Sequence, residues 1–204
     1  MSIVVLLLAA GGSTRMRGGD KLLEPLDGEP LLRRSARTAL ASRARETLVV
    51  TGANRVAREA ALAGLPVWIV HNADWRGGMG VSIAAGVAAL APAAPAVLVM
   101  PADMPDLDPA LLDRLIDSLP PDAPRTIVRP RTTEGTPGNP VLFGAAHLPA
   151  LSALDGDDGA RAVVARNRAF LRYLDDAGQG VLTDLDTPEA WAAWRDARRS
   201  GNGT

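Results

Sequence analysis

The sequence predicts a layered α/β domain with a mostly parallel sheet, and two observations lead to this fold class. Short apolar runs alternate with Ala-, Leu- and Arg-rich helical stretches from the first residues nearly to the last. No internal repeat and no long linker interrupts this alternation. With 204 residues and 47% hydrophobic content, the chain is long enough to bury one core. We therefore expect a single domain over residues 1–199, followed by a polar tail at residues 200–204.

Each element is placed by its hydrophobic pattern and by the residues at its ends. The apolar runs predict strands at Ile3–Ala9, Thr47–Thr51, Val67–Val70, Ala96–Met100, Thr126–Arg129, Pro140–Phe143 and Ala169–Tyr173. The helical stretches, several with a capping residue or a proline at the start, predict helices at Leu31–Ser42, Arg55–Leu62, Val81–Leu90, Pro109–Ser118, Ala145–Leu154, Ala160–Arg166 and Pro188–Arg198. In such sheets the functional site lies at the carboxyl ends of the strands. Three loops are expected to reach that edge: Ala10–Lys21, Pro101–Pro105 and Asp184–Pro188.

Composition excludes several classes of function. The chain has no cysteine, so disulfides, thiolate metal sites and cysteine nucleophiles are absent. A formal net charge of -1 argues against nucleic acid as a partner. The longest apolar run, Ile3 to Ala10, is too short to cross a bilayer and has no basic leader, which predicts a cytoplasmic protein without a membrane contact. His71 and His147 are isolated, so no hydrolytic triad is expected.

The loop after the first strand has the composition of a phosphate-binding loop. Its small residues, Gly11, Gly12 and Ser13, let backbone N–H groups approach an anion, and Arg15 and Lys21 neutralise phosphate charge. The spacing fits neither the Walker phosphate loop nor the dinucleotide fingerprint. A merely flexible glycine turn is the alternative. Lys21 is the only lysine among 22 basic residues, and a compact ammonium suits a crowded site between phosphate oxygens.

Two acidic residues are candidate metal ligands. Asp103 follows a buried strand and lies between two prolines, which is suitable for Mg²⁺, a cation held by one or two carboxylates together with phosphate oxygens and water. Asp186 could supply a second carboxylate. The alternative for Asp186 is an ordinary helix start, with Thr187 as the N-cap and Pro188 in the first turn.

Three further segments could face a substrate. The glycines of Gly77–Gly80 permit close approach by a base or ribose, and Ser82 could hydrogen-bond to it. Gly138–Pro140 and Asp155–Arg161 are turn-like pieces that could face an acceptor, although each alone is more often structural. Trp191 and Trp194, at helical spacing, are expected to be packing or interface residues and not a nucleobase platform.

Taken together, these segments resemble the NTP-transferase family of molybdenum cofactor nucleotidyltransferases, and most closely its cytidylyltransferase branch. A single fragment of this kind is a weak signal, but an ordered series is a strong one. The resemblance implies a three-layer Rossmann-like domain of the nucleotide-diphospho-sugar transferase type. The matching fragments run through almost the whole chain, at Leu8–Gly11, Arg15–Met16, Lys21–Leu23, Gly78–Ser82, Asp103–Pro105, Gly138–Val141, Gly156–Arg161 and Asp186–Pro188.

The resemblance implies a reaction and a set of site residues. CMP would move from CTP onto the terminal phosphate of molybdopterin, a phosphorylated pterin, with release of pyrophosphate, and the product would pass by contact to a molybdoenzyme or its chaperone. Asp103 would anchor Mg²⁺, with Asp186 as the second ligand, and Arg15 and Lys21 would stabilise the departing pyrophosphate. The nucleotide would contact Leu8, Ala9, Ala10, Gly11, Gly12, Ser13, Lys21, Gly78, Gly80 and Ser82, and the acceptor Asn139, Asp157 and Arg161.

Details of the motifs bear on specificity. Leu-Ala-Ala-Gly at Leu8–Gly11 is similar to the cytidylyl branch, whereas the guanylyl branch usually shows Leu-Ala-Gly-Gly, so CTP is favoured over GTP. Arg17 stands where glycine commonly follows Arg-Met. Pro137 stands where an arginine often precedes Gly-Asn-Pro, and that arginine could have met an anionic substrate. The second departure leaves the identity of the acceptor open.

Three alternatives therefore remain at the level of sequence. The first is transfer to another small phosphorylated acceptor, or from GTP, because the nucleotide half of a site constrains the acceptor half poorly. The second is an NAD(P)-dependent oxidoreductase on a similar fold, against which the missing fingerprint and ribose-binding acid count. The third is a nucleotide-binding or cofactor-delivery module without turnover.

Overall fold

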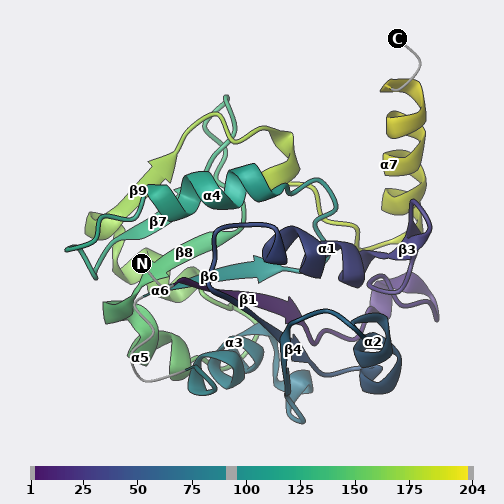
Figure 1. Cartoon of the computed structure of the whole chain (residues 1–204), viewed down its shortest axis with the longest axis horizontal. Coiled ribbons are helices and arrows are strands. Elements are labelled where there is room, and N and C mark those ends of the chain that lie inside the picture. The colour runs from purple at the N-terminus through teal and green to yellow at the C-terminus, as the bar shows by residue number, and fades with distance from the viewer. Residues whose placement is uncertain (1–2, 91–95, 202–204) are drawn as a thin grey trace.

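The computed structural model describes residues 3–90 and 96–201, and its centre is a seven-stranded mixed sheet (Figure 1). The strand order is β5-β4-β1-β6-β8-β7-β9. Strands β5, β4, β1 and β6 are parallel, β8 runs antiparallel to β6 and β7, and β9 is parallel to β7. Their bounds are β1 Ile3–Ala9, β4 Glu46–Thr51, β5 Trp68–His71, β6 Ala96–Pro101, β7 Ile127–Pro130, β8 Val141–Gly144 and β9 Leu171–Leu174.

All seven predicted strands are present, and the structure adds one small hairpin that the sequence analysis missed. Strand β9 begins two residues later than expected, because Arg168–Phe170 forms a 3-10 turn first. The added hairpin pairs β2 (Pro25–Leu26) with β3 (Glu29–Pro30). Asp27 and Gly28 between them both have positive φ, as the two central residues of a tight hairpin turn require. The Asp-Gly dipeptide was therefore a usable signal.

Seven α-helices were predicted and seven are described. They are α1 Leu31–Leu40, α2 Arg55–Ala61, α3 Met79–Ala88, α4 Pro109–Asp117, α5 Leu148–Ser152, α6 Arg161–Arg166 and α7 Pro188–Gly201. The helix expected at Ala145–Leu154 is divided into a 3-10 turn at Ala145–His147 followed by α5. Helix α7 continues through Ser200 to Gly201, two residues past the expected domain boundary, and residues 202–204 lie outside the described part.

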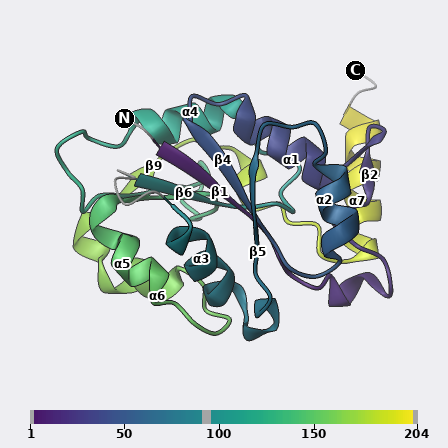
Figure 2. The same cartoon turned by 60° about the horizontal axis from the view of Figure 1, so that its bottom comes forward.

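The helices cover both faces of the sheet and make three layers (Figure 2). Alternate residues of β1 point to opposite faces, as the two-residue period of a strand dictates. Val5 and Leu7 belong to a core shared with α1 and α4. Leu6 belongs to a core shared with α3, α5 and α6. Both faces of β1 are buried, which explains why its sequence is a continuous apolar run without polar alternation.

The position of β1 determines where a ligand site can form. Strand β1 lies between β4 and β6. After β1 the chain first adds β4 and β5 on one side of it, and later adds β6 and the remaining strands on the other side. In α/β sheets, ligands bind outside the carboxyl ends of the strands at such a reversal of strand order. The loop after Ala9 occupies this place. Among the described residues, no helix is both long and apolar enough to span a membrane.

We predict that Gly86→Ala lowers the stability of the domain. Alanine normally stabilises a helix by about 1 kcal/mol relative to glycine. At this position, however, a Cβ atom would lie 2.3 Å from Leu6 Cδ1 and 2.8 Å from Val50 Cγ2, because α3 approaches the sheet closely. Overpacking of this kind costs about 1–3 kcal/mol, so the net free energy of unfolding should fall in urea denaturation. Gly11→Ala is the matched control, since nothing lies within 4 Å of its Cβ. A more stable Gly86→Ala protein would contradict the described packing of α3.

Candidate active site

A cavity of about 680 Å³ opens at the carboxyl end of β1. Most of the nucleotide-loop residues singled out in the sequence line it, together with both candidate metal ligands and the two predicted cations. Sequence reasoning did not include Trp75, which also lines the cavity and packs against the loop. The lining residues that had been predicted are Leu8, Ala10, Gly11, Gly12, Ser13, Arg15, Lys21, Gly78, Ser82, Asp103, Asp157 and Asp186.

Two predicted nucleotide-binding residues, Ala9 and Gly80, do not line the cavity. Ala9 is 1% exposed and belongs to the core on the α1 side of the sheet, since alternate residues of the strand point to opposite faces. Gly80 is buried, and a Cβ there would lie 2.3 Å from the carbonyl oxygen of Asp155. Its N–H donates to the Gly156 carbonyl at 2.8 Å. Glycine at position 80 therefore serves close packing of the 155–157 turn on α3, not approach of a base.

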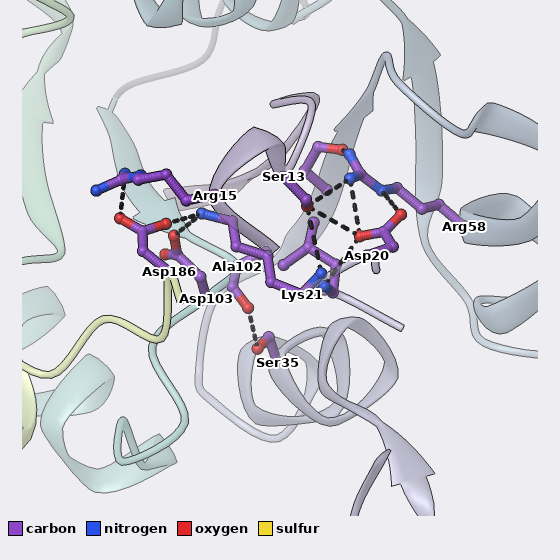
Figure 3. Close-up of polar contacts among 11 residues, drawn as sticks. Ser13, Arg15, Asp20, Lys21, Ser35, Arg58, Ala102, Asp103 and Asp186 are labelled. Atoms are coloured by element: carbon purple, nitrogen blue, oxygen red, sulfur yellow. Dashed lines mark hydrogen bonds and ion pairs between the residues drawn. The ribbon is translucent and has the colours of Figure 1, made fainter. Parts of the chain in front are cut away.

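The charged centre of the site joins three distant segments of the chain. Lys21 Nζ lies 2.5 Å from Asp103 Oδ2 and 2.5 Å from Asp186 Oδ1 (Figure 3). Arg15 forms an ion pair with the other oxygen of Asp186. The two carboxylates thus converge on one ammonium group, a pairing that the sequence analysis did not anticipate.

Backbone hydrogen bonds fix the two carboxylates relative to each other. The N–H of Ala102 donates to the Leu8 carbonyl at 3.1 Å, which ties the end of β6 to β1, and Ser35 Oγ donates to the Ala102 carbonyl at 2.8 Å. The N–H of Leu185 donates to the Asp103 carbonyl at 3.1 Å and brings the C-terminal segment alongside.

The segment around Asp186 starts a helix, which is one of the two interpretations that the sequence allowed. Thr187 Oγ1 accepts from the N–H of Ala190 at 3.1 Å, so Thr187 caps α7 as expected for a helix start. At the same time, the carboxylate of Asp186 reaches Lys21. One short sequence, Asp-Thr-Pro, therefore starts the helix and supplies a carboxylate to the cavity.

The pKa values of this cluster reflect a balance between burial and charge. Burial alone would lower the pKa of Lys21, but the charges and hydrogen bonds of Asp103 and Asp186 raise it above its ordinary value. Burial would raise the pKa of Asp186, yet its bonds to Lys21 hold that pKa below the ordinary range. Neighbouring Asp184 has a raised pKa because of burial and the negative charges of Asp186 and Asp103. Lys21 and Asp186 therefore hold each other in their charged forms.

A buried ion pair, which the sequence did not reveal, holds the loop in place. Arg58 from α2 is 1% exposed and forms two hydrogen bonds of 2.9 Å with the carboxylate of Asp20. It also donates to the Ala9 carbonyl at 2.8 Å and to Ser13 Oγ at 3.2 Å. Asn54 adds a bond to Asp20 at 3.0 Å. Figure 3 shows Arg58, Asp20 and Ser13 beside Lys21.

The pair is held in its charged form. Burial alone would raise the pKa of Asp20, but hydrogen bonds from Arg58 and Asn54 and the charge of Arg58 lower it below its ordinary value.

Within residues 3–90 and 96–201, Ser13 and Ser82 have no histidine partner, which agrees with the absence of a hydrolytic triad. Ser82 instead accepts from the side-chain amide of Asn72 at 3.1 Å.

Helix α7 supports the loop from its outer side. Trp191 is 2% exposed and packs in one cluster with Met16 of the loop and Leu26 of the hairpin. Trp194 packs against this cluster, and its indole N–H donates to Asp106. The expectation that both tryptophans are packing residues is confirmed. Their packing partners include Met16 of the Ala10–Lys21 loop.

The fold and the site together define a nucleotidyltransferase, an α/β enzyme that brings a glycine-containing loop, a lysine and two carboxylates to one cavity. Residues 5–172 match the MobA-like NTP transferase domain family, and the chain belongs to this family. Asp186 lies beyond the matched residues, so its inclusion in the candidate site rests on its ion pair with Lys21.

Named relatives cover nearly the whole chain. It is 34% identical over 195 residues to nicotine blue oxidoreductase of Paenarthrobacter nicotinovorans, covering 90% of this chain and 91% of that protein. It is 32% identical over 206 residues to the purine catabolism protein PucB of Bacillus subtilis (strain 168), covering 96% and 97%. Among solved structures, Rv0371c from Mycobacterium tuberculosis H37Rv has a TM-score of 0.81 at 26% identity, covering 95% and 97%. A further structure of Rv0371c, in complex with manganese, has a TM-score of 0.78 at 26% identity and the same coverage. These similarities agree with membership of the family. The names describe different roles, so they do not identify the substrate of this chain.

We predict that Arg58→Met destabilises the domain strongly. The substitution leaves the Asp20 carboxylate largely buried without its charge partner, which typically costs about 3–5 kcal/mol. Urea denaturation at neutral pH measures the loss. The control is Arg55→Met on the same helix, because Arg55 is 54% exposed and its pair with Glu59 spans one turn. Such surface pairs contribute about 0.3–0.5 kcal/mol. Equal effects of the two substitutions would show that the buried pair does not hold the loop.

Proposed function

We propose that this enzyme transfers CMP from CTP to the terminal phosphate of a molybdopterin-type acceptor and releases pyrophosphate. The observation that carries the proposal is the convergence of Asp103 and Asp186 on Lys21, in a cavity that the Ala10–Arg15 loop also lines. Loop, cation and paired carboxylates are the parts that nucleotidyl transfer needs. The acceptor rests on the similarity of the motifs to the cytidylyl branch.

The donor set fits a divalent magnesium ion. Mg²⁺ is held in proteins by one or two carboxylates together with phosphate oxygens and water. Asp103 and Asp186 already share a cation, the ammonium of Lys21, so their oxygens converge on one point. Among the described residues, no group of three or more His, Cys, Asp or Glu side chains could hold a metal. The remaining ligands would therefore come from the nucleotide and from water, and the bound ion would neutralise charge on the α-phosphate.

The chain's own residues supply positioning and charge. The acceptor phosphate attacks the α-phosphorus in line, the bond to the β-phosphate oxygen breaks, and pyrophosphate leaves. Lys21 and Arg15 stabilise the charge that develops on the leaving pyrophosphate. Gly11 and Gly12 line the cavity, and their backbone N–H groups would donate to the phosphate oxygens. In this reaction no protein side chain needs to form a covalent bond to the substrate.

The test of this function is pyrophosphate release from each of the four NTPs with Mg²⁺, with and without molybdopterin. We expect release that depends on CTP and on the acceptor. Pyrophosphate release with a different phosphorylated acceptor would support the nucleotidyltransferase reaction but show that molybdopterin is not the acceptor. Binding of NADPH with substrate reduction, and no pyrophosphate, would overturn the proposal in favour of a redox enzyme.

We predict that Asp103→Asn reduces this turnover by about 10²- to 10³-fold, since a metal anchor contributes several kcal/mol to the transition state. The carboxylate does not pack the core, so the melting temperature should change little. The matched control is Asp122→Asn, the same change at an exposed position outside the cavity, which should leave the rate unaltered. Near-normal pyrophosphate release by folded Asp103→Asn would exclude Asp103 as the metal anchor.

A second prediction concerns the base. Ala10 lines the cavity, and its carbonyl accepts from the N–H of Ala53 at 2.9 Å, so its methyl group is held in place. One methyl group in a tight pocket shifts discrimination by about 1–3 kcal/mol, or roughly 10–200-fold. We expect wild type to prefer CTP over GTP by about this factor, and Ala10→Gly to relax the preference in part. Ala9→Gly is the control, because Ala9 faces the core. Equal use of CTP and GTP by wild type would contradict the cytidylyl assignment.

A further inference from the structure

A second chamber of about 180 Å³ adjoins the nucleotide cavity. The two spaces share Leu8, Met79, Pro101 and Asp157 in their linings, so a ligand can extend from one into the other. Side chains of two kinds line the second chamber. One group is apolar and includes Ile83, Val99, Val141, Phe143 and Val164. The other is polar and includes Arg129, Asn139, Asp158 and Arg161.

Arg129 on β7 lies beside the segment that precedes Asn139. It donates from Nε to the Gly138 carbonyl at 2.9 Å and from Nη2 to the Pro137 carbonyl at 3.5 Å. These bonds hold its guanidinium, and therefore a positive charge, beside the Pro137–Asn139 segment.

The two arginines of the chamber are not neutralised. Within the described part of the chain, neither Arg129 nor Arg161 forms an ion pair with a carboxylate, although Asp157 and Asp158 also line the chamber. Burial lowers the pKa of Arg129, and the positive charge of Arg161 acts in the same direction. Both guanidinium groups nevertheless stay protonated, since arginine does not lose its proton in proteins. Two unpaired guanidinium groups beside an apolar lining favour a ligand that is partly apolar and partly anionic.

We propose that this chamber binds the body of the acceptor and that Arg129 and Arg161 recognise a second oxyanion on it. This inference rests on the proposed function. The attacking phosphate must lie near Asp103 and Lys21, and neither of these lines the second chamber. The arginines in turn do not line the nucleotide cavity. The acceptor class is therefore a partly apolar molecule with a reacting phosphate in the nucleotide cavity and a second oxyanion, such as a carboxylate or a phosphate, in the second chamber.

Calorimetric titration with simple aromatic probes tests the proposal without knowledge of the acceptor. The probes are 1-naphthoate and 1-naphthyl phosphate, with neutral 1-naphthamide for comparison. We expect both anions to bind wild type more tightly than the amide. Arg129→Gln and Arg161→Gln should each weaken the anions about 10-fold or more, and the amide little, because only the anions use charged hydrogen bonds. The anion that binds more tightly, the carboxylate or the phosphate, identifies the kind of oxyanion that the arginines prefer.

Arg166→Gln is the matched control, since Arg166 is exposed on the same helix as Arg161 and does not line the chamber. If Arg129 only fixed the Gly138 segment, its removal would weaken the anions and the amide alike, and the proposal would be wrong. Arg161 is exposed, so its variant folds independently of that segment and keeps the test valid. CTP binding, measured in parallel, separates the two proposals. If the arginines recognise the anions but wild type does not bind CTP, this inference stands and the proposed function is wrong. If wild type binds CTP but the arginine variants bind the anions as tightly as wild type does, the proposed function stands and this inference is wrong.

Discussion

Arg58 lies beneath the loop that follows β1, and almost every feature of the nucleotide cavity depends on its pairing with Asp20. The loop has few apolar side chains of its own and could not hold one shape by hydrophobic burial. Arg58 compensates with a planar fork of donors that satisfies Asp20, Ser13 and the end of β1 together. Ser13 Oγ in turn accepts from the N–H of Lys21 at 3.3 Å, so the backbone of the lysine is fixed to the same group. Met16, packed against Trp191, fixes the other side of the loop.

On this rigid base, the charged centre is arranged for exchange of partners. Lys21 bonds to the same carboxylates that are proposed to take a metal ion, and Arg15 bonds to one of them. In the proposed reaction, a nucleotide that arrives with its cation would offer phosphate oxygens to the lysine and a new positive charge to the carboxylates. Every charged group would then keep a partner throughout binding. Such an exchange avoids the large cost of leaving a charge unpaired in a partly buried site.

Much of this arrangement could be predicted from the sequence, because it depends on patterns that are local. Seven apolar runs gave seven strands. The limits of β1, β4, β6 and β8 are the clearest, because a strand buried on both faces contains few polar residues. The loop, Lys21 and Asp103 could be placed because small residues and charges at strand ends lie at one edge of a parallel sheet.

The features that sequence analysis missed depend on tertiary partners. Arg58 occurs in an Arg-Val-Ala-Arg-Glu stretch that is typical of a solvent-facing helix, and only Asp20, 38 residues earlier, makes its burial favourable. Arg129 belongs to a strand, and its contact with Gly138 becomes visible only when the loop folds back. Gly80 was found for its small size, but the neighbour that requires it is backbone from residue 155, not a nucleotide.

The bond between Lys21 and Asp186 spans 165 residues, and this separation has a consequence for synthesis of the protein. The loop that carries Lys21 is therefore synthesised well before the second carboxylate. A nascent chain that already contains all seven strands of the sheet still lacks Asp186 and the tryptophan that supports Met16. The charged centre can thus be completed only after the whole sheet has been synthesised. Truncation near residue 172, where the family match ends, would leave such an unfinished form permanently.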